Sequence, residues 1–204
     1  MILPIRIWGD PILKRRAVAV DRITASERKL ISDMIETMQE ADGMGLAAPQ
    51  VGVSKRIFVF RRDDDIHAII NPRIVRRAGG RKIGNEGCLS IPGVQAKVAR
   101  HTRIVVAGRD QNGKTTELEC EDGEEQGRAA TCVQHELDHL DGVLYIEKTE
   151  PETISWLIEE EDEDGEEDVV LRATTPEEIK RAYLARRLPP RLHILDSLRQ
   201  RIEK

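Results

Sequence analysis

Two histidines four residues apart, with a glutamate directly after the first, constrain this chain more than any other feature. They lie in the segment CVQHELDHLDG, which runs from Cys132 to Gly142. On a helix with about 100° between successive residues, His135 and His139 differ by only about 40° around the axis and project from one face. Both imidazoles can then reach one cation, with Glu136 close enough to act on a water bound to it. The segment therefore predicts a helix that carries a hydrolytic metal site.

Two histidines do not complete such a site, because a catalytic metal normally has three protein ligands and one open position. The alternative is an accidental pair on an amphipathic helix, although buried histidines without a metal would need other hydrogen-bond partners. Cys88 is a candidate third ligand, since it follows a glycine between two predicted strands and the cation would neutralise its thiolate. The alternative for an isolated cysteine is a small buried hydrophobic side chain.

The order of the remaining elements predicts an α+β domain and not a repeating βαβ chain. Apolar residues at helical spacing predict one helix over 25–41 and a second from about Arg128 to Asp141, ended by Gly142. The stretch GMGLAAPQ at 43–50 is expected to be irregular because of its glycines and proline. Strands are predicted at 55–60, 67–71, 94–110 and 114–120, the last two joined by the turn Gln111-Asn112-Gly113.

The composition favours a globular protein with an aliphatic core. Of the 204 residues, 39% are hydrophobic but only 3% are aromatic. The net charge of −5 argues against a dedicated nucleic-acid binder, and no apolar run approaches the ~20 residues that span a bilayer. The first residues, MILPIRIWGD, lack the pattern of a signal peptide. Three cysteines, an odd number, fit a reducing compartment better than a disulfide framework. We expect a cytoplasmic protein that does not contact membranes.

The last quarter of the chain differs from the rest. Glu159–Asp168, EEEDEDGEED, is expected to form a solvated acidic loop. Thr175 and Pro176, followed by two glutamates, predict a helix start. Pro189-Pro190 would interrupt that helix, and Arg191–Lys204 would form another. We therefore predict a catalytic domain over 1–148 and an extension over 149–204, built from the acidic loop and helices.

Three stretches together resemble one family, the peptide deformylases. They are GMGLAAPQ at 43–50, EGCLS at 86–90 and QHELDHLDG at 134–142, in the family's order and at similar separations. The similarity extends from about Ile5 to Ile146. The resemblance implies a fold in which the helix bearing the His-Glu-x-x-His motif is surrounded by antiparallel sheets. It also implies a metal-dependent hydrolase that removes the N-formyl group from the N-terminal formylmethionine of newly synthesised proteins and releases formate.

The resemblance gives each candidate residue a role. Cys88, His135 and His139 would bind the metal, which would be one Fe2+ per chain, with Zn2+, Ni2+ or Co2+ able to replace it. Glu136 would be the general acid/base, and Gln50 with the backbone N–H of Leu89 would stabilise the oxyanion. The residues expected to bind substrate are Gly43, Met44, Gly45, Gly87 and Cys132. Those expected around the site are Glu86, Arg100 and Asp138.

Some of these roles have alternatives. Gly43 and Gly45 would let an extended peptide pair its backbone with this segment. Cys132 would lie near the pocket for the methionine side chain, or would simply be part of the core. Arg100 is expected to meet Glu86 or Asp138. Arg128 stands where related bacterial proteins often have an apolar residue near that pocket, and the charged loop over 121–127 is longer and more acidic than theirs.

The expected partners are nascent N-formylmethionyl polypeptides, and the protein is expected to be a monomer. Some family members contact the ribosome through a C-terminal extension, and basic residues could do so here, although a basic helix face is usually just solvated. The two competing functions are a general metallopeptidase with the same motif and a catalytically degenerate binding protein. The basic residues considered for the ribosome contact are Arg181, Arg186, Arg187, Arg191, Arg199 and Arg201.

Overall fold

The computed structural model describes residues 1–123, 127–161, 167–194 and 198. These residues form two compact units, and each is described by itself. Unit 1 consists of Met1–Arg6, Pro11–Lys82 and Arg100–Leu144. Unit 2 consists of Ile7–Asp10, Ile83–Ala99 and Tyr145–Lys204. This division does not test where a catalytic domain would end, so the boundary after residue 148 stays a prediction.

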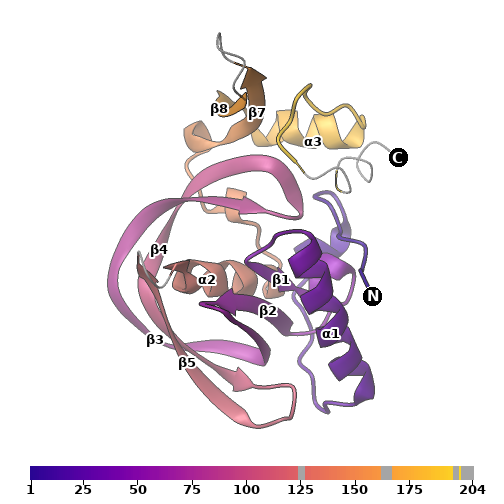
Figure 1. Ribbon diagram of the computed structural model, residues 1–204, viewed down its shortest axis with the longest axis vertical. Helices are drawn as coiled ribbons and strands as arrows, with labels where there is room; N and C mark the ends of the chain where they lie inside the picture. Colours follow the sequence, from indigo (N-terminus) through magenta and orange to yellow (C-terminus); the bar gives the residue numbers. More distant parts are fainter. Residues whose placement is uncertain (124–126, 162–166, 195–197, 199–204) are drawn as a thin grey trace. The chain divides into compact units, whose positions relative to one another are not determined.

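The secondary structure confirms the predicted α+β class, with an antiparallel sheet and few helices (Figure 1). The sheet order is β1-β2-β3-β4-β5-β6, with β7 paired to β4 and β8 paired to β7. The helices are α1 (Ala25–Glu40), α2 (Ala129–Leu140) and α3 (Pro176–Leu184), with 3-10 turns at Pro11–Lys14, Ala48–Val51, Tyr145–Glu147 and Pro151–Thr153. The strands are β1 (Gly45–Ala47), β2 (Ile57–Arg62), β3 (Asp65–Cys88), β4 (Ile91–Arg109), β5 (Thr115–Gly123), β6 (Gly127–Arg128), β7 (Ser155–Glu161) and β8 (Glu167–Ala173).

The core of unit 1 lies around α2, which packs against β1, β2 and β5, while α1 packs against β1 and β2 (Figure 1). Aliphatic and small side chains dominate it, as the composition requires. Among them, the Cys120 thiol is fully buried, and burial raises its pKa to about 11, so it stays protonated near neutral pH. The residues of this cluster are Ala17, Ala47, Phe58, Phe60, Ile69, Ile104, Val106, Cys120, Ala129, Ala130, Cys132, Val133, Leu137 and Leu140.

Helix α1 carries its own N-terminal cap. Thr24 accepts a hydrogen bond from Ser26 N–H at 3.2 Å, and Glu27 Oε2 accepts one from Thr24 N–H at 2.8 Å. Glu27 also forms an ion pair with Lys55. The hydrogen bond from Lys55, followed by that from Thr24, lowers the pKa of Glu27 from its usual 4.5 to about 2. The predicted helix over 25–41 is thus confirmed almost to the residue.

The expectation of an irregular segment over 43–50 was wrong for Gly45–Ala47. These three residues form strand β1 and pair with β2 in the register Gly45↔Phe60, Leu46↔Val59 and Ala47↔Phe58. Glycine weakens a strand by itself, but pairing with a fully buried neighbour decides the outcome here. The strand expected at 67–71 is only the first part of β3, which continues to Cys88.

The two charged loops are also shorter than predicted. Strand β5 continues to Gly123 and turns back into β6, with Asp122↔Arg128 and Gly123↔Gly127 as pairs. Strands β7 and β8 pair from Ser155↔Ala173 to Glu161↔Glu167, so the ends of the acidic segment belong to a hairpin. Residues 124–126 and 162–166 lie outside the described part of the chain. Successive side chains of a strand point to opposite faces, so a strand can keep many charged side chains in solvent. A run of such charges in the sequence therefore resembles a loop.

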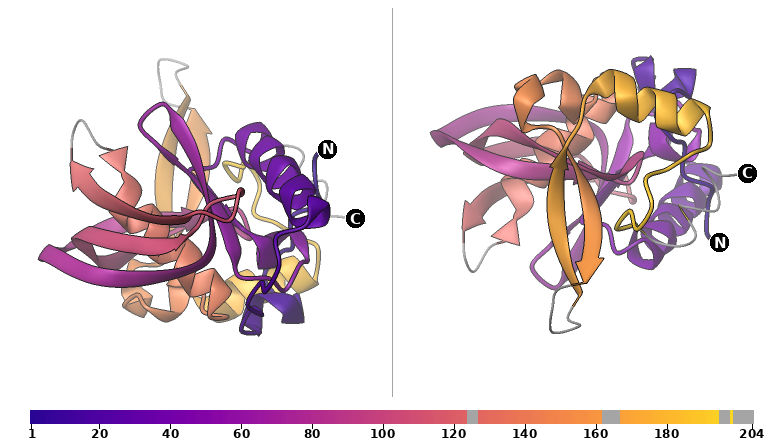
Figure 2. Two further views of the ribbon diagram at one scale, coloured as in Figure 1. Left: turned by 90° about the horizontal axis from the view of Figure 1, so that it is seen from below. Right: turned by 90° about the horizontal axis from the view of Figure 1, so that it is seen from above.

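Unit 2 contains the β7–β8 hairpin and helix α3, which lie beside each other (Figures 1 and 2). Thr175 caps α3 in a capping box with Glu178, which confirms the predicted start. The helix ends at Leu184, before Pro189-Pro190. A helix from Arg191 was predicted wrongly at its beginning, because Leu192 forms a β-bridge with Ile158 instead. Residues 195–197 and 199–204 are outside the described range. Among the described helices, none is long and apolar enough to cross a membrane.

Candidate metal centre

Helix α2 carries both histidines and is buried on nearly every side. All of its residues except Asp138 are buried, including His135, Glu136 and His139. The two imidazole rings lie one helical turn apart, with centroids 4.9 Å from each other and an angle of 76° between them. The four-residue spacing thus brings both rings to one face of the helix, as the sequence predicted.

The N-terminus of α2 is capped from a different element. Its N-cap residue, Arg128, makes no side-chain cap hydrogen bond. Instead, Asp122 on β5 accepts a hydrogen bond from Thr131 N–H at 2.9 Å and a second one from the Thr131 hydroxyl. A carboxylate at this end of a helix also interacts favourably with the helix dipole. The sequence does not reveal this role of Asp122, since no local pattern connects it to a helix that starts seven residues later.

Two polar contacts attach α2 to strand β4. Gln134 Nε2 donates to His101 O at 2.8 Å, and Gln134 Oε1 accepts from His101 N–H at 3.2 Å. Arg100 Nη1 lies 2.6 Å from Asp138 Oδ2, and both side chains are largely buried. The contact expected for Arg100 is thus made with Asp138. Together these bonds fix the rotation of α2 about its axis, which determines where the histidines point.

Contacts with other segments of unit 1 also fix the C-terminal end of α2. Leu140 O accepts from Ala17 N–H at 2.8 Å and from Arg56 Nη1 at 3.3 Å, which satisfies one of the helix's terminal carbonyl groups. Gly142 has a φ of +74°, and a Cβ atom there would approach Lys14 O to 2.9 Å. Both facts require glycine, so the predicted role of Gly142 as helix terminator is confirmed.

In unit 2, Cys88 is the last residue of β3, at the corner where the chain turns into β4. Its sulfur accepts a hydrogen bond from Ser90 N–H at 3.4 Å. Ser90 is fully buried, and its carbonyl accepts from Trp8 N–H at 2.8 Å. These hydrogen bonds fix the backbone directly after the cysteine.

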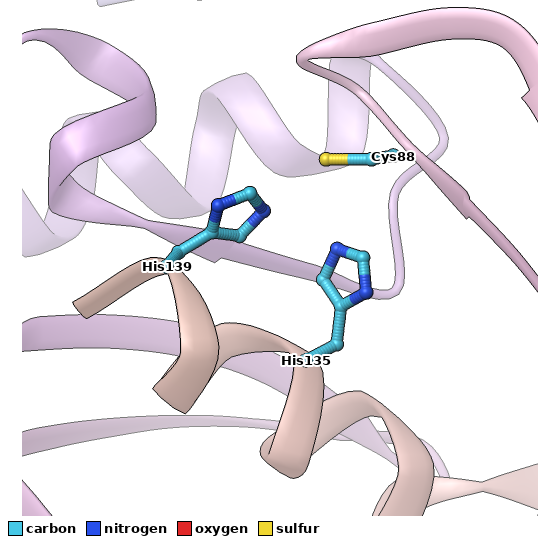
Figure 3. Close-up of side chains that lie close together, drawn as sticks. All are labelled: Cys88, His135 and His139. Atoms are coloured by element: carbon cyan, nitrogen blue, oxygen red, sulfur yellow. The ribbon is translucent and has the colours of Figure 1, made fainter. Parts of the chain in front are cut away.

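Cys88, His135 and His139 can together hold one metal ion. One ligand atom from each residue lies within 4.8 Å of the other two, and Figure 3 shows the three side chains converging. A thiolate and two neutral imidazoles are the soft and intermediate donors that suit Zn2+ and other divalent transition metals. Three protein ligands leave a coordination position for water or substrate. The donor set therefore fits a catalytic metal, and the residues present can provide it.

Gly45 leaves the space that the Glu136 carboxylate occupies. A Cβ atom on Gly45 would lie 2.5 Å from Glu136 Oε1 and 2.7 Å from Cys132 Sγ. Real Cβ atoms do not approach other atoms this closely, so either the carboxylate or strand β1 would have to move. Gly45 was predicted to allow substrate approach, and this second requirement was not predicted, because the sequence alone does not show that β1 packs on α2.

Gln50 is buried with one end of its amide fixed. Its Oε1 accepts a hydrogen bond from Ala47 N–H at 2.8 Å. This bond orients the amide, so the donor groups are at the Nε2 end. Asparagine and glutamine orientations are assigned from such hydrogen bonds, and here the assignment leaves Gln50 suited to donate.

The other candidate residues have varied surroundings. Met44 is 44% exposed, and its carbonyl accepts from Arg61 N–H at 2.8 Å. Gly43 and Leu89 are half-buried, whereas Gly87 is exposed. Glu86 is buried in unit 2, and Arg128 is exposed on β6. Cys132 is buried in the core cluster, which agrees with the core-packing alternative.

The chain is similar to known proteins over most of its length. The profile of the polypeptide deformylase family matches residues 2–154. A peptide deformylase from Dictyoglomus thermophilum is 45% identical over 154 residues, covering 76% of this chain and 97% of that protein. A peptide deformylase from Acidothermus cellulolyticus is 44% identical over 151 residues, covering 74% of this chain and 81% of that protein.

Solved structures show the same similarity. A peptide deformylase from Synechococcus elongatus in complex with actinonin has a TM-score of 0.68 and 42% identity, covering 72% of this chain and 79% of its own. The peptide deformylase from Thermotoga maritima has a TM-score of 0.68 and 41% identity, covering 74% of this chain and 99% of its own. The residues after 154 lie beyond the family match.

Proposed function

The chain belongs to the polypeptide deformylase family, and we propose that Cys88, His135 and His139 are its metal ligands and Glu136 its general acid/base. The protein is a metal-dependent hydrolase that removes the N-formyl group from the N-terminal formylmethionine of newly synthesised proteins and releases formate. The observation that supports the ligand assignment is the grouping of one sulfur and two ring nitrogens within 4.8 Å.

We propose ferrous iron as the metal, one ion per chain, with Zn2+, Ni2+ or Co2+ able to replace it. When bound, the metal supplies Lewis acidity, which lowers the pKa of water from ~15.7 towards neutrality. The thiolate of Cys88 would reduce that Lewis acidity by donating charge and would make the site sensitive to oxidation.

Glu136 would move the proton. A formamide is a poor electrophile and its amine a poor leaving group, so the reaction needs a base for the attacking water and an acid for the departing nitrogen. A carboxylate oxygen of Glu136 takes the proton from the water and then gives it to the amine. Burial of Glu136 and the space left by Gly45 keep this carboxylate in one place.

Gln50 Nε2 and the N–H of Leu89 would donate to the formyl oxygen as negative charge builds on it. Each such preorganised donor is worth about 3–4 kcal/mol of transition-state stabilisation. For Gln50, the hydrogen bond from Ala47 N–H to Oε1 supports this role, because it fixes the side-chain amide with Nε2 as its donor end.

The substrate would bind in an extended conformation along β1. Of the described strands, β2 is the one that pairs with β1, which stands first in the sheet order. A peptide strand added there would receive backbone hydrogen bonds from the segment Gly43–Gly45 and so would tolerate many sequences. Gly87 and Cys132 would contribute to the formyl and methionine subsites, with Glu86, Arg100 and Asp138 supporting the site.

An anaerobic formate-release assay, with metal analysis of the same sample, tests the proposal. Glu136→Gln should retain the metal and lose about 10²–10⁴-fold in kcat, whereas Cys88→Ala should lose the metal itself. A Glu136→Gln variant that turned over normally would exclude the proposed proton transfer. Formyl-Met and acetyl-Met peptides, compared side by side, distinguish a deformylase from a general metallopeptidase.

We also propose a ribosome contact for the extension, a monomeric state and a cytoplasmic location. Helix α3 carries Arg181, and Arg186 and Arg187 follow directly after it. Arg191 is partly neutralised, because its Nη2 lies 3.8 Å from Glu161 Oε2. Arg199 and Arg201 fall outside the described residues. Co-sedimentation with ribosomes should decrease when Arg181, Arg186 and Arg187 are replaced by glutamine, and equal sedimentation would refute the contact.

A further inference from the structure

The corner that presents Cys88 is continuous with a segment that the C-terminal extension covers. After Cys88, Leu89 and Ser90 form the turn, and Ile91 begins β4. Within unit 2, Trp156, Tyr183 and Leu192 pack on Ile91–Gln95, and all three lie after residue 154, where the family match ends. These contacts are therefore a feature of this chain and not of the matched domain.

Tyr183 on α3 makes the most direct of these contacts. Its hydroxyl donates to Pro92 O at 2.7 Å in a buried position. The Tyr183 ring also meets the edge of Trp156, with centroids 6.2 Å apart, and Trp156 pairs with Val94 through β7. One residue of the extension thus joins two neighbouring points of the strand that follows the cysteine.

Gly93, between those two points, shows how closely the extension approaches. Its φ is +73°, and a Cβ atom there would lie 2.5 Å from the Leu192 side chain. Leu192 is almost fully buried and is fixed by its bridge to Ile158. The segment Ile91–Gln95 is therefore enclosed by the extension at successive residues.

Both tyrosines that donate to this segment remain protonated. Tyr145, within the family match, donates to Val94 O at 2.9 Å. Burial, followed by the nearby charge of Cys88, raises the pKa of Tyr145 and of Tyr183 well above the usual value. Each phenol therefore keeps the proton that the hydrogen bond requires.

We propose that Tyr183, supported by Trp156 and Leu192, is a positioning residue for the Cys88–Ser90 corner, so that the extension controls how firmly Cys88 holds the metal. This inference rests on the proposed role of Cys88 as a ligand. A strand fixed at Pro92 and Val94 restricts the backbone two to six residues away, which sets the direction of the Cys88 sulfur and of the Leu89 N–H. Changes in the residues that orient metal ligands typically weaken metal affinity about 10–100-fold. Because Tyr183 acts on Cys88 only through the backbone, we expect its loss to weaken metal affinity by about 10-fold or less.

The test uses the full chain loaded with Co2+, whose bond to a thiolate gives a charge-transfer absorption band. Tyr183→Phe removes the hydroxyl and keeps the ring against Trp156. We expect metal release to a chelator about 3- to 10-fold faster than in the wild type, a shifted charge-transfer band, and a lower kcat for deformylation with little change in KM. Leu184→Ala is the matched control, since Leu184 is adjacent on α3 and 70% exposed.

The possible results separate the two proposals. Tyr183→Phe indistinguishable from Leu184→Ala in release rate and absorption would overturn the positioning role while leaving Cys88 as a ligand. A wild-type cobalt protein without the charge-transfer band would overturn the ligand assignment itself. A Tyr145→Phe variant that loosened the metal when Tyr183→Phe did not would assign the support to the matched domain and so overturn the role of the extension. If Tyr183→Phe failed to fold by circular dichroism, Leu192→Val would replace it with the same criteria.

Discussion

Helix α1 carries at its own N-terminus the side chains that cap it, whereas helix α2 is capped by Asp122, which belongs to β5. The capping box of α1 is complete within Thr24 and Glu27. Helix α2 has no such pair at its N-cap, and further polar contacts attach it to Arg100 and His101 on β4 and to Ala17 and Arg56 elsewhere in unit 1.

The difference follows from what each helix does. One face of α1 is exposed, so local capping is enough to fix its ends. Helix α2 is buried almost completely and must place His135, Glu136 and His139 accurately, and only partners from other elements can fix its rotation and position. Substitutions around α1 should therefore change stability alone, and those around α2 should change catalysis as well.

The largest effect is expected for Gly45→Ala, which tests whether α2 depends on β1 for its chemistry. The added methyl group would meet Glu136 Oε1 at 2.5 Å, and a displacement of about 1 Å in a catalytic group costs about 100-fold in rate. We expect kcat to fall by about that factor, measured by formate release. Gly80→Ala is the matched control, since a Cβ atom there meets nothing within 4 Å. Equal kcat values for the two variants would contradict the proposed constraint.

Arg100→Met should have the next largest effect. It leaves Asp138 with a poorly solvated charge at the side of α2, and we expect a loss of about 2 kcal/mol in the free energy of unfolding together with a lower metal content. Arg103→Met, on the same strand, removes an exposed arginine whose ion pair with Glu119 is screened by solvent and should contribute little to stability. Urea unfolding of both variants measures the difference, and similar losses would show that burial of the pair is unimportant.

Asp122→Ala and Thr24→Ala compare the two caps directly. Each removes the acceptor for a helix N-terminus, and each should cost about 1 kcal/mol in unfolding free energy. We expect only Asp122→Ala to lower kcat as well, because it loosens the helix that carries Glu136. The comparison between α1 and α2 would fail if Thr24→Ala reduced kcat to the same extent.

The smallest effect concerns the pH dependence of α1. The pKa of Glu27 is lowered to about 2 in the folded protein from its usual 4.5, so its contribution to stability is complete above pH 4.5 and disappears as the pH falls towards 2. Glu27→Gln should therefore reduce the unfolding free energy by about 0.5–1 kcal/mol at pH 7 and by less at pH 3. Glu40→Gln, at the exposed end of α1, is the control, and a difference independent of pH would contradict the lowered pKa.

The sequence predicted the helices and the hairpin at 94–120 well, because capping boxes, apolar spacing and the turn Gln111-Asn112-Gly113 are local signals. It failed for Gly45–Ala47, for the strand parts of the two acidic segments and for the start of the helix expected at Arg191. In each case pairing with another segment of the chain decides the structure: β2 for β1, β6 for the end of β5, β8 for the end of β7, and Ile158 for Leu192.

The candidate site also has features that local sequence patterns predict and features that they do not. The His-Glu-x-x-His spacing is local, and the grouping of Cys88 with the two histidines agrees with the ligand set that the family resemblance implied. Asp122 and Tyr183 were missed, because a cap from another strand and a hydrogen bond to Pro92 leave no pattern in the sequence. The contact between Arg100 and Asp138 was anticipated only as one of two alternatives.

The burial of Cys120 makes the chain a convenient reporter of its own metal content. Cys120 is fully buried in the core with its thiol protonated, and Cys132 is buried in the same cluster. Of the three cysteines, Cys88 is the one that is not buried. A thiol-directed dye should therefore label a folded sample at one position and only where the ligand sulfur is unoccupied, so that the dye incorporated per chain measures the vacant fraction in a single reading.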